Sequence, residues 1–339
     1  MLADMRLLAT DLDGTLVFHH VVGQADAEAL VRWRAAGNLL VLATGRSVRL
    51  VQHAVEVARA STSIGLDYDY AVCATGTTVI DAAGQVHRTR MLEADQVRAV
   101  VRAIGDVAQA PVSVFASTLE RDYVLDDPIG LSTDQRTPPD RFTAAPLSQV
   151  AGLGVTSMPL HIPDVRAAAA LARGLEETVD GISCTRSTGF VDVTAAGESK
   201  GAGLGRLAEL LADQGVEVSE MAAVGDSWND ISMFERADVP CAMAGAPGEV
   251  VEAAGGCTTP SVAAFIDALL AQRPHTSTET SKKTRLRVDS EDSVEVMAVG
   301  RGPRGGPLRP GRSGRRWSPA ARSRRGGRGG WRPRAWGGR

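Results

Sequence analysis

Short, mostly apolar runs that end abruptly in polar residues recur along the chain. Residues 5–10, 39–43 and 221–224 read MRLLAT, LLVLA and MAAV, and glycine, hydroxyl-bearing or acidic residues follow each of them closely. Apolar runs of four or five residues are typical of strands buried on both faces, as parallel sheets require. Other stretches have helical spacing, such as the leucines of residues 204–211. This alternation predicts an α/β protein with a doubly wound, Rossmann-like parallel sheet.

The first polar run, DLDGTL, begins at Asp11, directly after the first predicted strand. Residues two apart on an extended chain project to the same side, so the carboxylates of Asp11 and Asp13 leave the strand together. Two unit charges about 4 Å apart repel by about 4 kcal/mol at an effective dielectric near 20. A cation between them, or a reaction that needs both, would justify that cost. An ordinary strand-to-loop turn, which Asp-Gly also marks, is the alternative.

A second polar run, Thr44-Gly45-Arg46-Ser47, follows the strand predicted at 39–43. Thr44 offers a hydroxyl, Gly45 offers an unobstructed backbone N–H, and a helix beginning near Ser47 would point its amide end at an anion. A plain strand-to-helix turn capped by Ser47 is equally compatible with these residues.

Two further polar runs lie in the second half of the chain. Lys200 falls in the first turn of a predicted helix, where the helix dipole disfavours a cation unless an anion faces it. Asp226, Asn229 and Asp230 follow the strand predicted at 221–224 and add two carboxylates and an amide.

In a parallel α/β sheet these four runs meet at one edge, where such sheets bind their ligands. Four carboxylates would then face one lysine, and a phosphate dianion could enter only with a divalent cation. Mg²⁺ suits an all-oxygen site of this kind. A nucleophilic carboxylate beside a second carboxyl group is suited to phosphoryl transfer through an aspartyl-phosphate.

The order DLDGT, TGR, Lys200 and GDSWND resembles the haloacid dehalogenase superfamily of phosphohydrolases over about residues 5–272. The long segment between the second and third motifs resembles its Cof-like, class IIB members, which carry an α/β cap domain there. Two positions depart from the family pattern: Ala74-Thr75-Gly76 stands where Asn-Gly is usual, and Gly245 where asparagine is usual.

The resemblance implies a role for each site residue. Asp11 would be the nucleophile and a metal ligand, and Asp13 the general acid and base, with its backbone carbonyl on the metal. Asp226 would be the third protein ligand to Mg²⁺, and Asp230 would support it or Lys200. The phosphoryl oxygens would be held by Thr44, Lys200 and Asn229 and by the amides of Leu12 and Gly45.

The same resemblance predicts the domain organisation. Residues 1–81 and 190–272 should form the catalytic core, and residues 82–189 the cap. Residues 273–339 lose apolar periodicity and should form a disordered tail. The four cysteines are scattered along the chain and suggest neither a disulfide framework nor a zinc site.

Charge is distributed unevenly along the chain. The formal net charge is −3, but residues 301–339 contain 13 arginines and no acid, which leaves about −16 on the first 300 residues. Such an Arg/Gly-rich tail with interleaved tryptophans could bind RNA or another polyanion. A passive tail and an out-of-frame extension are the simpler alternatives. Apolar runs stay shorter than 18 residues and no signal-peptide pattern is present, which predicts a cytoplasmic protein that does not enter membranes.

We therefore predict a Mg²⁺-dependent phosphatase that acts on a small phosphate monoester, either a sugar phosphate or a phosphorylated cofactor precursor. A phosphomannomutase-like phosphotransferase is the alternative with the same fold. A polyanion-binding or RNA-binding protein that acts through residues 301–339 is the alternative from another class.

Overall fold

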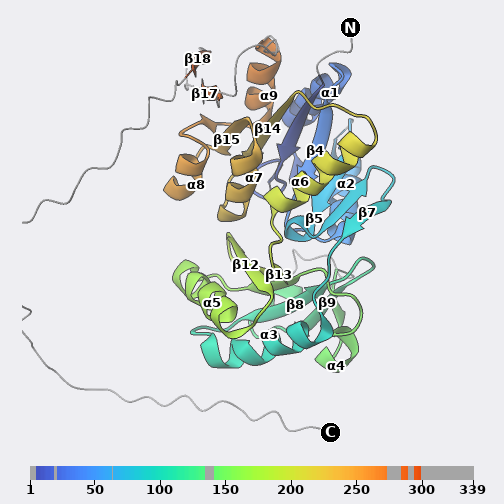
Figure 1. Cartoon of the computed structure of the whole chain (residues 1–339), viewed down its shortest axis with the longest axis vertical. Coiled ribbons are helices and arrows are strands. Elements are labelled where there is room, and N and C mark those ends of the chain that lie inside the picture. Colours follow the sequence, from blue (N-terminus) through green and yellow to red (C-terminus); the bar gives the residue numbers. More distant parts are fainter. Residues whose placement is uncertain are drawn as a thin grey trace, which may run out of the picture. The chain divides into compact units, whose positions relative to one another are not determined.

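The fold is built from two large sheets with helices packed against them (Figure 1). The computed structural model describes residues 5–18, 21–62, 64–133, 141–272, 284–288 and 294–298. The chain runs from the first sheet into the second and back again, so that residues from both ends of this range complete the first sheet.

The first sheet has eight strands in the order β16-β15-β14-β1-β4-β5-β6-β7. All strands from β16 to β5 are parallel, and β6 and β7 add an antiparallel edge. The strands are β1 (Arg6–Thr10), β4 (Leu39–Ala43), β5 (Tyr70–Cys73), β6 (Thr78–Asp81), β7 (Val86–Thr89), β14 (Glu220–Gly225), β15 (Val239–Met243) and β16 (Thr258–Thr259). A small hairpin of β2 (Val17–Phe18) and β3 (Val21–Val22) follows β1.

Helices cover both faces of this sheet. Leu8 of β1 packs in one cluster with α1 (Gln24–Ala35), α2 (Val48–Ser61) and α9 (Val262–Ala271). Its neighbours Leu7 and Ala9 pack in a second cluster with α6 (Lys200–Asp213), α7 (Ile231–Arg236) and α8 (Gly248–Ala253). Alternate residues of a strand point to opposite faces, so a continuous apolar run is what a strand buried on both faces needs. The predicted α/β class with a doubly wound parallel sheet is confirmed.

Serine side chains begin three of these helices. Ser47, Ser199 and Ser261 are the N-cap residues of α2, α6 and α9, and each side-chain oxygen accepts a hydrogen bond from the backbone three residues on. Such caps satisfy one of the free amides of the first turn. They fix where α2 and α6 start, and therefore where the polar residues beside those starts lie.

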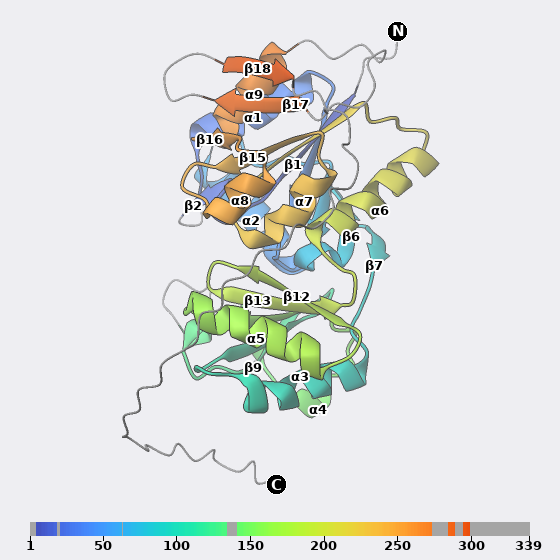
Figure 2. The ribbon, with the colours of Figure 1, turned by 60° about the vertical axis from the view of Figure 1, so that its left-hand side comes forward.

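The second sheet has six strands in the order β10-β9-β8-β11-β13-β12 and belongs to the inserted α/β segment. Its strands are β8 (Ser113–Ser117), β9 (Asp122–Asp126), β10 (Thr143–Ala144), β11 (Met158–His161), β12 (Ile182–Ser187) and β13 (Phe190–Ala195). Its helices are α3 (Ala94–Val107), α4 (Leu147–Val150) and α5 (Val165–Thr178). Figure 2 shows α3 beyond this sheet, on the side away from the first one. Strand pairing puts β7 in the first sheet and β13 in the second, so the chain passes between them near residues 90 and 196.

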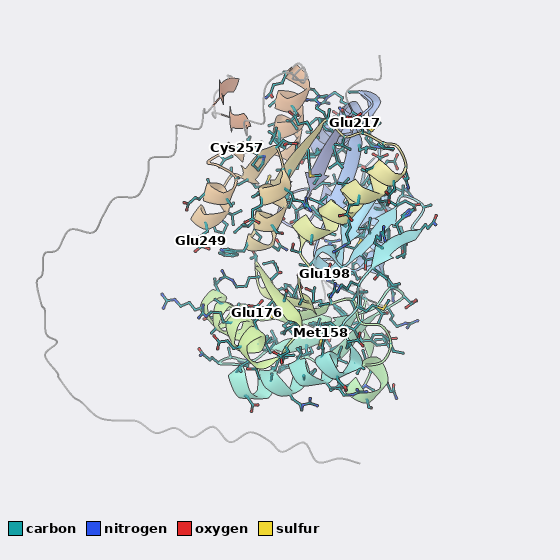
Figure 3. The ribbon with its side chains drawn as sticks, viewed as in Figure 1. Met158, Glu176, Glu198, Glu217, Glu249 and Cys257 are labelled. Atoms are coloured by element: carbon teal, nitrogen blue, oxygen red, sulfur yellow. A yellow bond between two sulfur atoms is a disulfide. The ribbon has the colours of Figure 1, made fainter. Side chains whose placement is uncertain are left out.

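The two crossings are tied to one another by Glu198, which Figure 3 labels where the chain returns to the first sheet. Its buried carboxylate pairs with Arg206 of α6, and Arg90 of the outgoing crossing lies 3.9 Å from it. Arg206 also donates a 2.7 Å hydrogen bond to the carbonyl of Gly76. These contacts anchor both crossings to the first sheet.

The segment predicted as a tail is described only at β17 (Thr284–Val288) and β18 (Val294–Ala298), which form an antiparallel pair. The other residues of 273–339, including the arginine-rich stretch, lie outside the described residues. The predicted disordered tail and its possible binding of RNA or another polyanion fall on these residues. Within the described ranges, no helix is long and apolar enough to cross a membrane.

The expectation for the cysteines was wrong at one pair. Cys241 and Cys257 form a disulfide with Cα atoms 4.8 Å apart, and both are buried. They lie side by side because β15 and β16 are parallel neighbours with Ala242 opposite Thr258, which puts the preceding residues next to each other. Spacing along the chain gave no sign of this, because the pairing depends on strand register. Cys73 and Cys184 are free.

We expect two of the four cysteines to react with iodoacetamide when the protein is denatured without reductant, and all four to react after reduction. Reduction should also lower the free energy of unfolding by about 3 kcal/mol, since the bond closes a loop of 16 residues. Mass spectrometry and denaturant titration measure the two effects. Alkylation of all four cysteines without reductant would contradict the pairing.

Candidate active site

Three neighbouring strands bring the polar runs together at one edge of the first sheet. β14, β1 and β4 are adjacent, with Val224 opposite Thr10 and Thr10 opposite Leu42. Residues that follow these strands, among them Asp226, Asp11 and Thr44, therefore leave the sheet at the same edge. The lysine comes from elsewhere, at the start of α6.

Lys200 lies between two of the carboxylates. Its Nζ donates hydrogen bonds of 2.7 Å to Oδ1 of Asp11 and of 2.7 Å to Oδ1 of Asp230, and the lysine is fully buried. Burial works to lower the pKa of Lys200, but the two carboxylates outweigh it and raise that pKa, so the amine stays charged. The position in the first helical turn, unfavourable by itself, is compensated by these two ion pairs.

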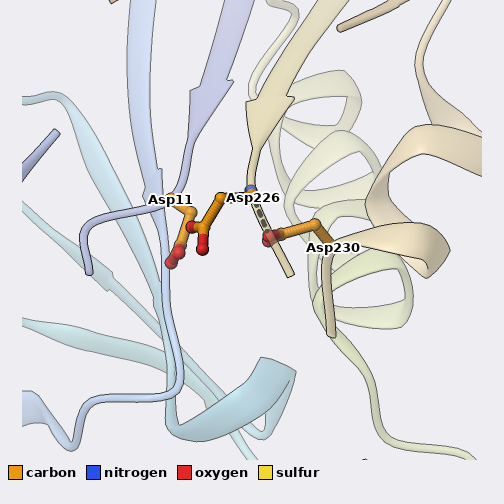
Figure 4. A group of neighbouring side chains, drawn as sticks. All are labelled: Asp11, Asp226 and Asp230. Atoms are coloured by element: carbon orange, nitrogen blue, oxygen red, sulfur yellow. Dashed lines mark hydrogen bonds between the residues drawn. The ribbon is translucent and has the colours of Figure 1, made fainter. Parts of the chain in front are cut away.

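Asp230 uses both of its oxygens within the protein. Oδ1 accepts from Lys200. Oδ2 accepts from the amide of Asp226 at 2.9 Å, as Figure 4 shows, and from the amide of Ser227 at 2.9 Å. Gly225 allows this close approach, because a Cβ there would lie 2.3 Å from the carboxyl carbon of Asp230. Asp230 therefore holds the loop that carries Asp226.

Asp11 and Asp226 each keep one oxygen free. Oδ1 of Asp11 is bound by Lys200, and Oδ1 of Asp226 accepts a 2.8 Å bond from the hydroxyl of Thr15. Among the described residues, Oδ2 of each carboxylate accepts no hydrogen bond, and both side chains line the same cavity. Gly14, whose φ is +84°, leaves room here: a Cβ would lie 2.6 Å from Oδ2 of Asp226.

The cluster carries more negative than positive charge. Asp11, Asp226 and Asp230, drawn in Figure 4, can each offer an oxygen within 4.8 Å of the others. Lys200, which bonds to Asp11 and Asp230, supplies the positive charge beside them. Burial, helped by the charges of Asp230 and Asp226, raises the pKa of Asp11 well above its usual value despite Lys200. Burial also raises the pKa of Asp226. An all-oxygen site with surplus negative charge fits a small divalent cation.

Asp13 differs from Asp11 in its surroundings. Its side chain is 60% exposed and forms a two-pronged ion pair with Arg46, with distances of 2.6 and 2.7 Å. Desolvation in the cleft works to raise the pKa of Asp13, but the hydrogen bonds and charge of Arg46 outweigh it and lower that pKa. Asp13 is therefore the accessible carboxylate of the pair.

Several unused hydrogen-bonding groups lie near Asp11. In the described part of the chain, the amides of Leu12 and Gly45 donate to no acceptor, and Oδ1 of Asn229 is buried without a partner. Thr44 and Asn229 line the same cavity as Asp11. Six of the predicted site residues line this cavity, namely Asp11, Asp13, Thr44, Gly45, Asp226 and Asn229. Lys200 and Asp230 do not line it but adjoin it through the ion pair of Lys200 with Asp11.

That space is a cavity of about 320 Å³ between the two sheets. Its far wall belongs to the second sheet, where strand residues alternate. Val114 and Ala116 of β8 pack in the cluster with α3 and α5, whereas Phe115 and Ser117 line the cavity. The other strand residues of this wall are Asp122, Pro159, Ser187, Phe190 and Asp192.

These wall residues were not predicted from the sequence. A signal is present in VFAS and FVDV, which alternate between small apolar residues and larger or polar ones. Alternation does not tell which face meets the cavity, and that depends on where α3 and α5 pack.

Asp192 is the buried acid of this wall. It accepts a 2.7 Å hydrogen bond from the hydroxyl of Thr75, whose φ is +55°. Burial raises the pKa of Asp192 to about 6, against the lowering effects of Thr75 and Lys200. Through this bond the second sheet contacts the loop after β5, at one of the two positions that depart from the family pattern.

Comparison with known proteins gives a consistent result. A family model described as haloacid dehalogenase-like hydrolase matches residues 8–263. The pyridoxal phosphate phosphatase of Escherichia coli (strain K12) is 30% identical over 282 residues, which cover 77% of this chain and 97% of that protein. A 5-amino-6-(5-phospho-D-ribitylamino)uracil phosphatase of Bacillus subtilis (strain 168) is 25% identical, covering 78% of this chain and 98% of that one.

Solved structures share the fold. The haloacid dehalogenase subclass IIB sugar phosphatase BT4131 aligns with a TM-score of 0.60 at 20% identity, over 76% of this chain and 94% of its own. The phosphatase BT1666 of Bacteroides thetaiotaomicron aligns with a TM-score of 0.63 at 24% identity, over 78% and 94%.

We expect Asp192→Asn to stabilise the protein at pH 8 and to have little effect at pH 4. With its pKa raised from 3.8 to about 6, Asp192 favours folding while it is protonated, and this contribution is lost as pH rises through about 6. The shift corresponds to at most about 3 kcal/mol. Thermal unfolding of both proteins at the two pH values measures the difference. Equal effects of the substitution at both would contradict it.

Proposed function

This chain belongs to the haloacid dehalogenase-like hydrolases, and we propose that it is a Mg²⁺-dependent phosphatase which hydrolyses a small phosphate monoester through an aspartyl-phosphate. The contrast between Asp11 and Asp13 carries the proposal. Asp11 is buried and oriented by Lys200, as a nucleophile must be. Asp13 reaches the cavity with an accessible carboxylate, as a proton donor must. Two carboxylates in two environments suit two roles.

In the proposed reaction, the free oxygen of Asp11 attacks phosphorus in line and the bond from phosphorus to the alcohol oxygen breaks. Asp13 donates its proton to that departing oxygen. A water molecule then attacks the phosphorus of the aspartyl-phosphate while Asp13 takes up one of its protons. Inorganic phosphate leaves, and Asp11 and protonated Asp13 are regenerated.

Arg46 must release Asp13 for this to happen. The ion pair keeps Asp13 ionised, whereas the first step needs it protonated. An incoming phosphate dianion competes for the same guanidinium, since two-pronged pairing suits phosphate as well as carboxylate. Substrate binding would thus weaken the pair and allow Asp13 to take up its proton.

The phosphoryl oxygens would be held by groups that are already in place. The free amides of Leu12 and Gly45 supply two donors, and Thr44 and Asn229 supply side-chain groups. Lys200 reduces the repulsion between Asp11 and the phosphate dianion. Fixed donors of this kind stabilise charge as it develops on the transferring group.

The residues that would hold Mg²⁺ are Asp11, Asp226 and the backbone carbonyl of Asp13. When bound, the ion would supply Lewis-acid stabilisation of the phosphoryl oxygens. The free oxygen of Asp226 supports this assignment, and Asp11 would offer the metal its Oδ1, the oxygen that accepts from Lys200 and does not attack phosphorus. Asp230 has no spare oxygen among its contacts, so we assign it to positioning Lys200 and the Asp226 loop.

The relatives support a phosphorylated small metabolite as the substrate. The E. coli relative is named for pyridoxal phosphate and a B. subtilis one for a phosphorylated ribitylaminouracil. A phosphorylated cofactor or cofactor precursor is therefore the substrate class that we propose.

Removal of divalent metal should lower the rate of phosphate release from p-nitrophenyl phosphate by at least about 100-fold, and added Mg²⁺ should restore it. The surplus of carboxylates at the site is the reason. Colorimetric phosphate assay after dialysis against chelator measures it. Activity that survives chelation unchanged would exclude the metal, and sugar-phosphate isomerisation without phosphate release would indicate a phosphotransferase instead.

Substitution of the two acids should separate their roles. Asp11→Asn should abolish turnover of every ester, because it removes the nucleophile. Asp13→Asn should lower kcat/KM, which reports the steps up to departure of the alcohol, by about 100- to 10,000-fold on an alkyl phosphate and by much less on p-nitrophenyl phosphate, because nitrophenolate leaves without a proton. Asp106→Asn, an exposed change on α3, is the matched control. Equal losses on both esters for Asp13→Asn would refute its assignment as general acid.

A further inference from the structure

Two polar groups on the cavity wall are buried without a partner. Oδ1 of Asp122 and Nε of Arg141 have no hydrogen-bond partner among the described residues, and both side chains line the cavity. Asp122 is only 1% exposed. Leaving such a group unsatisfied costs about 1–3 kcal/mol or more when it is charged. A ligand that bonds to both would remove that cost.

The other oxygen of Asp122 fixes where its free oxygen lies. Oδ2 accepts a 2.9 Å hydrogen bond from Ser47, the residue that directly follows Thr44-Gly45-Arg46. Asp122 is thereby held beside the loop to which we assign phosphate binding. A group that meets its Oδ1 must belong to the part of the substrate next to the phosphate, the leaving alcohol.

Aromatic side chains also line this wall. Phe115 and Phe142 lie with ring centroids 4.5 Å apart, and Phe190 also lines the cavity. The guanidinium of Arg141 lies 4.9 Å from the centroid of the Phe142 ring. Aromatic rings pack favourably against other aromatic rings, which makes a flat leaving group the best fit to this surface.

We propose that Asp122, Arg141 and the phenylalanines of this wall select a phosphate ester of an aromatic alcohol that carries a hydrogen-bond donor on its ring. The ring packs against Phe115, Phe142 and Phe190, its donor binds Oδ1 of Asp122, and an acceptor on the substrate takes the Nε–H of Arg141. This inference rests on the proposed phosphatase activity and adds to it the chemistry of the leaving group.

Four synthetic esters test the proposal: benzyl, 3-hydroxybenzyl, 3-methoxybenzyl and cyclohexylmethyl phosphate. All four release primary alkoxides of similar basicity, so differences in kcat/KM report recognition. We expect 3-hydroxybenzyl phosphate to exceed the benzyl and methoxy esters by about tenfold, as a hydrogen bond to a charged group allows. The benzyl ester should exceed the cyclohexylmethyl ester by about threefold or more.

The matched variants are Asp122→Asn and Arg141→Gln, with Asp106→Asn and Arg102→Gln on the exposed face of α3 as controls. Asp122→Asn and Arg141→Gln should each cut the 3-hydroxybenzyl-to-benzyl ratio at least about threefold, and the controls should not. Calorimetric binding of the same esters to Asp11→Asn, alone or with Asp122→Asn, reports the preference without turnover. Thermal unfolding identifies any variant that is merely unstable. For such a variant, the proposal is tested by the relative kcat/KM values of the native protein on the four esters.

The two proposals fail in different ways. If the native protein hydrolyses neither these esters nor p-nitrophenyl phosphate, the phosphatase proposal and this inference both fall. If it hydrolyses all four esters at similar kcat/KM, or if Asp122→Asn leaves the hydroxyl preference intact, only the inference about the wall is overturned.

Discussion

The double ion pair of Lys200 is the interaction on which the site depends. One fully buried ammonium group lies 2.7 Å from the carboxylates of Asp11 and Asp230, which are far apart in the sequence. Removing either carboxylate would leave a buried charge less well compensated, and removing the lysine would leave the acids to repel one another. The same contacts fix the free oxygen of Asp11 toward the cavity and, through Asp230, the loop that carries Asp226. Orientation and charge balance thus come from one side chain.

Much of the first sheet could be predicted because it is buried on both faces. Runs such as LLVLA read unambiguously, and the polar residues that follow them mark the carboxyl edge where ligands bind. The predicted helix starts near Ser47 and at Lys200 are confirmed. They could be predicted because a serine that caps the helix stands directly before residues with clear apolar periodicity. The family resemblance on these motifs is confirmed as well.

Three features escaped prediction because they depend on how separate segments meet. The Cys241–Cys257 pair needs the register of β15 against β16, which no local pattern reveals. The ion pair of Asp13 with Arg46 needs two loops to face each other. The residues of the cavity wall need the packing side of α3 and α5. In each case the reactive or polar residues are visible in the sequence, but the residues that they contact are determined by tertiary structure.

The alternation along β8 and β13 has a consequence for how this protein can change. Val114, Ala116, Val191 and Val193 belong to the packing face of the second sheet, while the residues between them face the cavity. The side chain at every second position is thus not part of the core between this sheet and its helices. None of the proposed reacting groups lies on these strands. Descendants of this chain could therefore acquire new substrates through substitutions at alternate positions, without reworking either the hydrophobic core or the reaction chemistry.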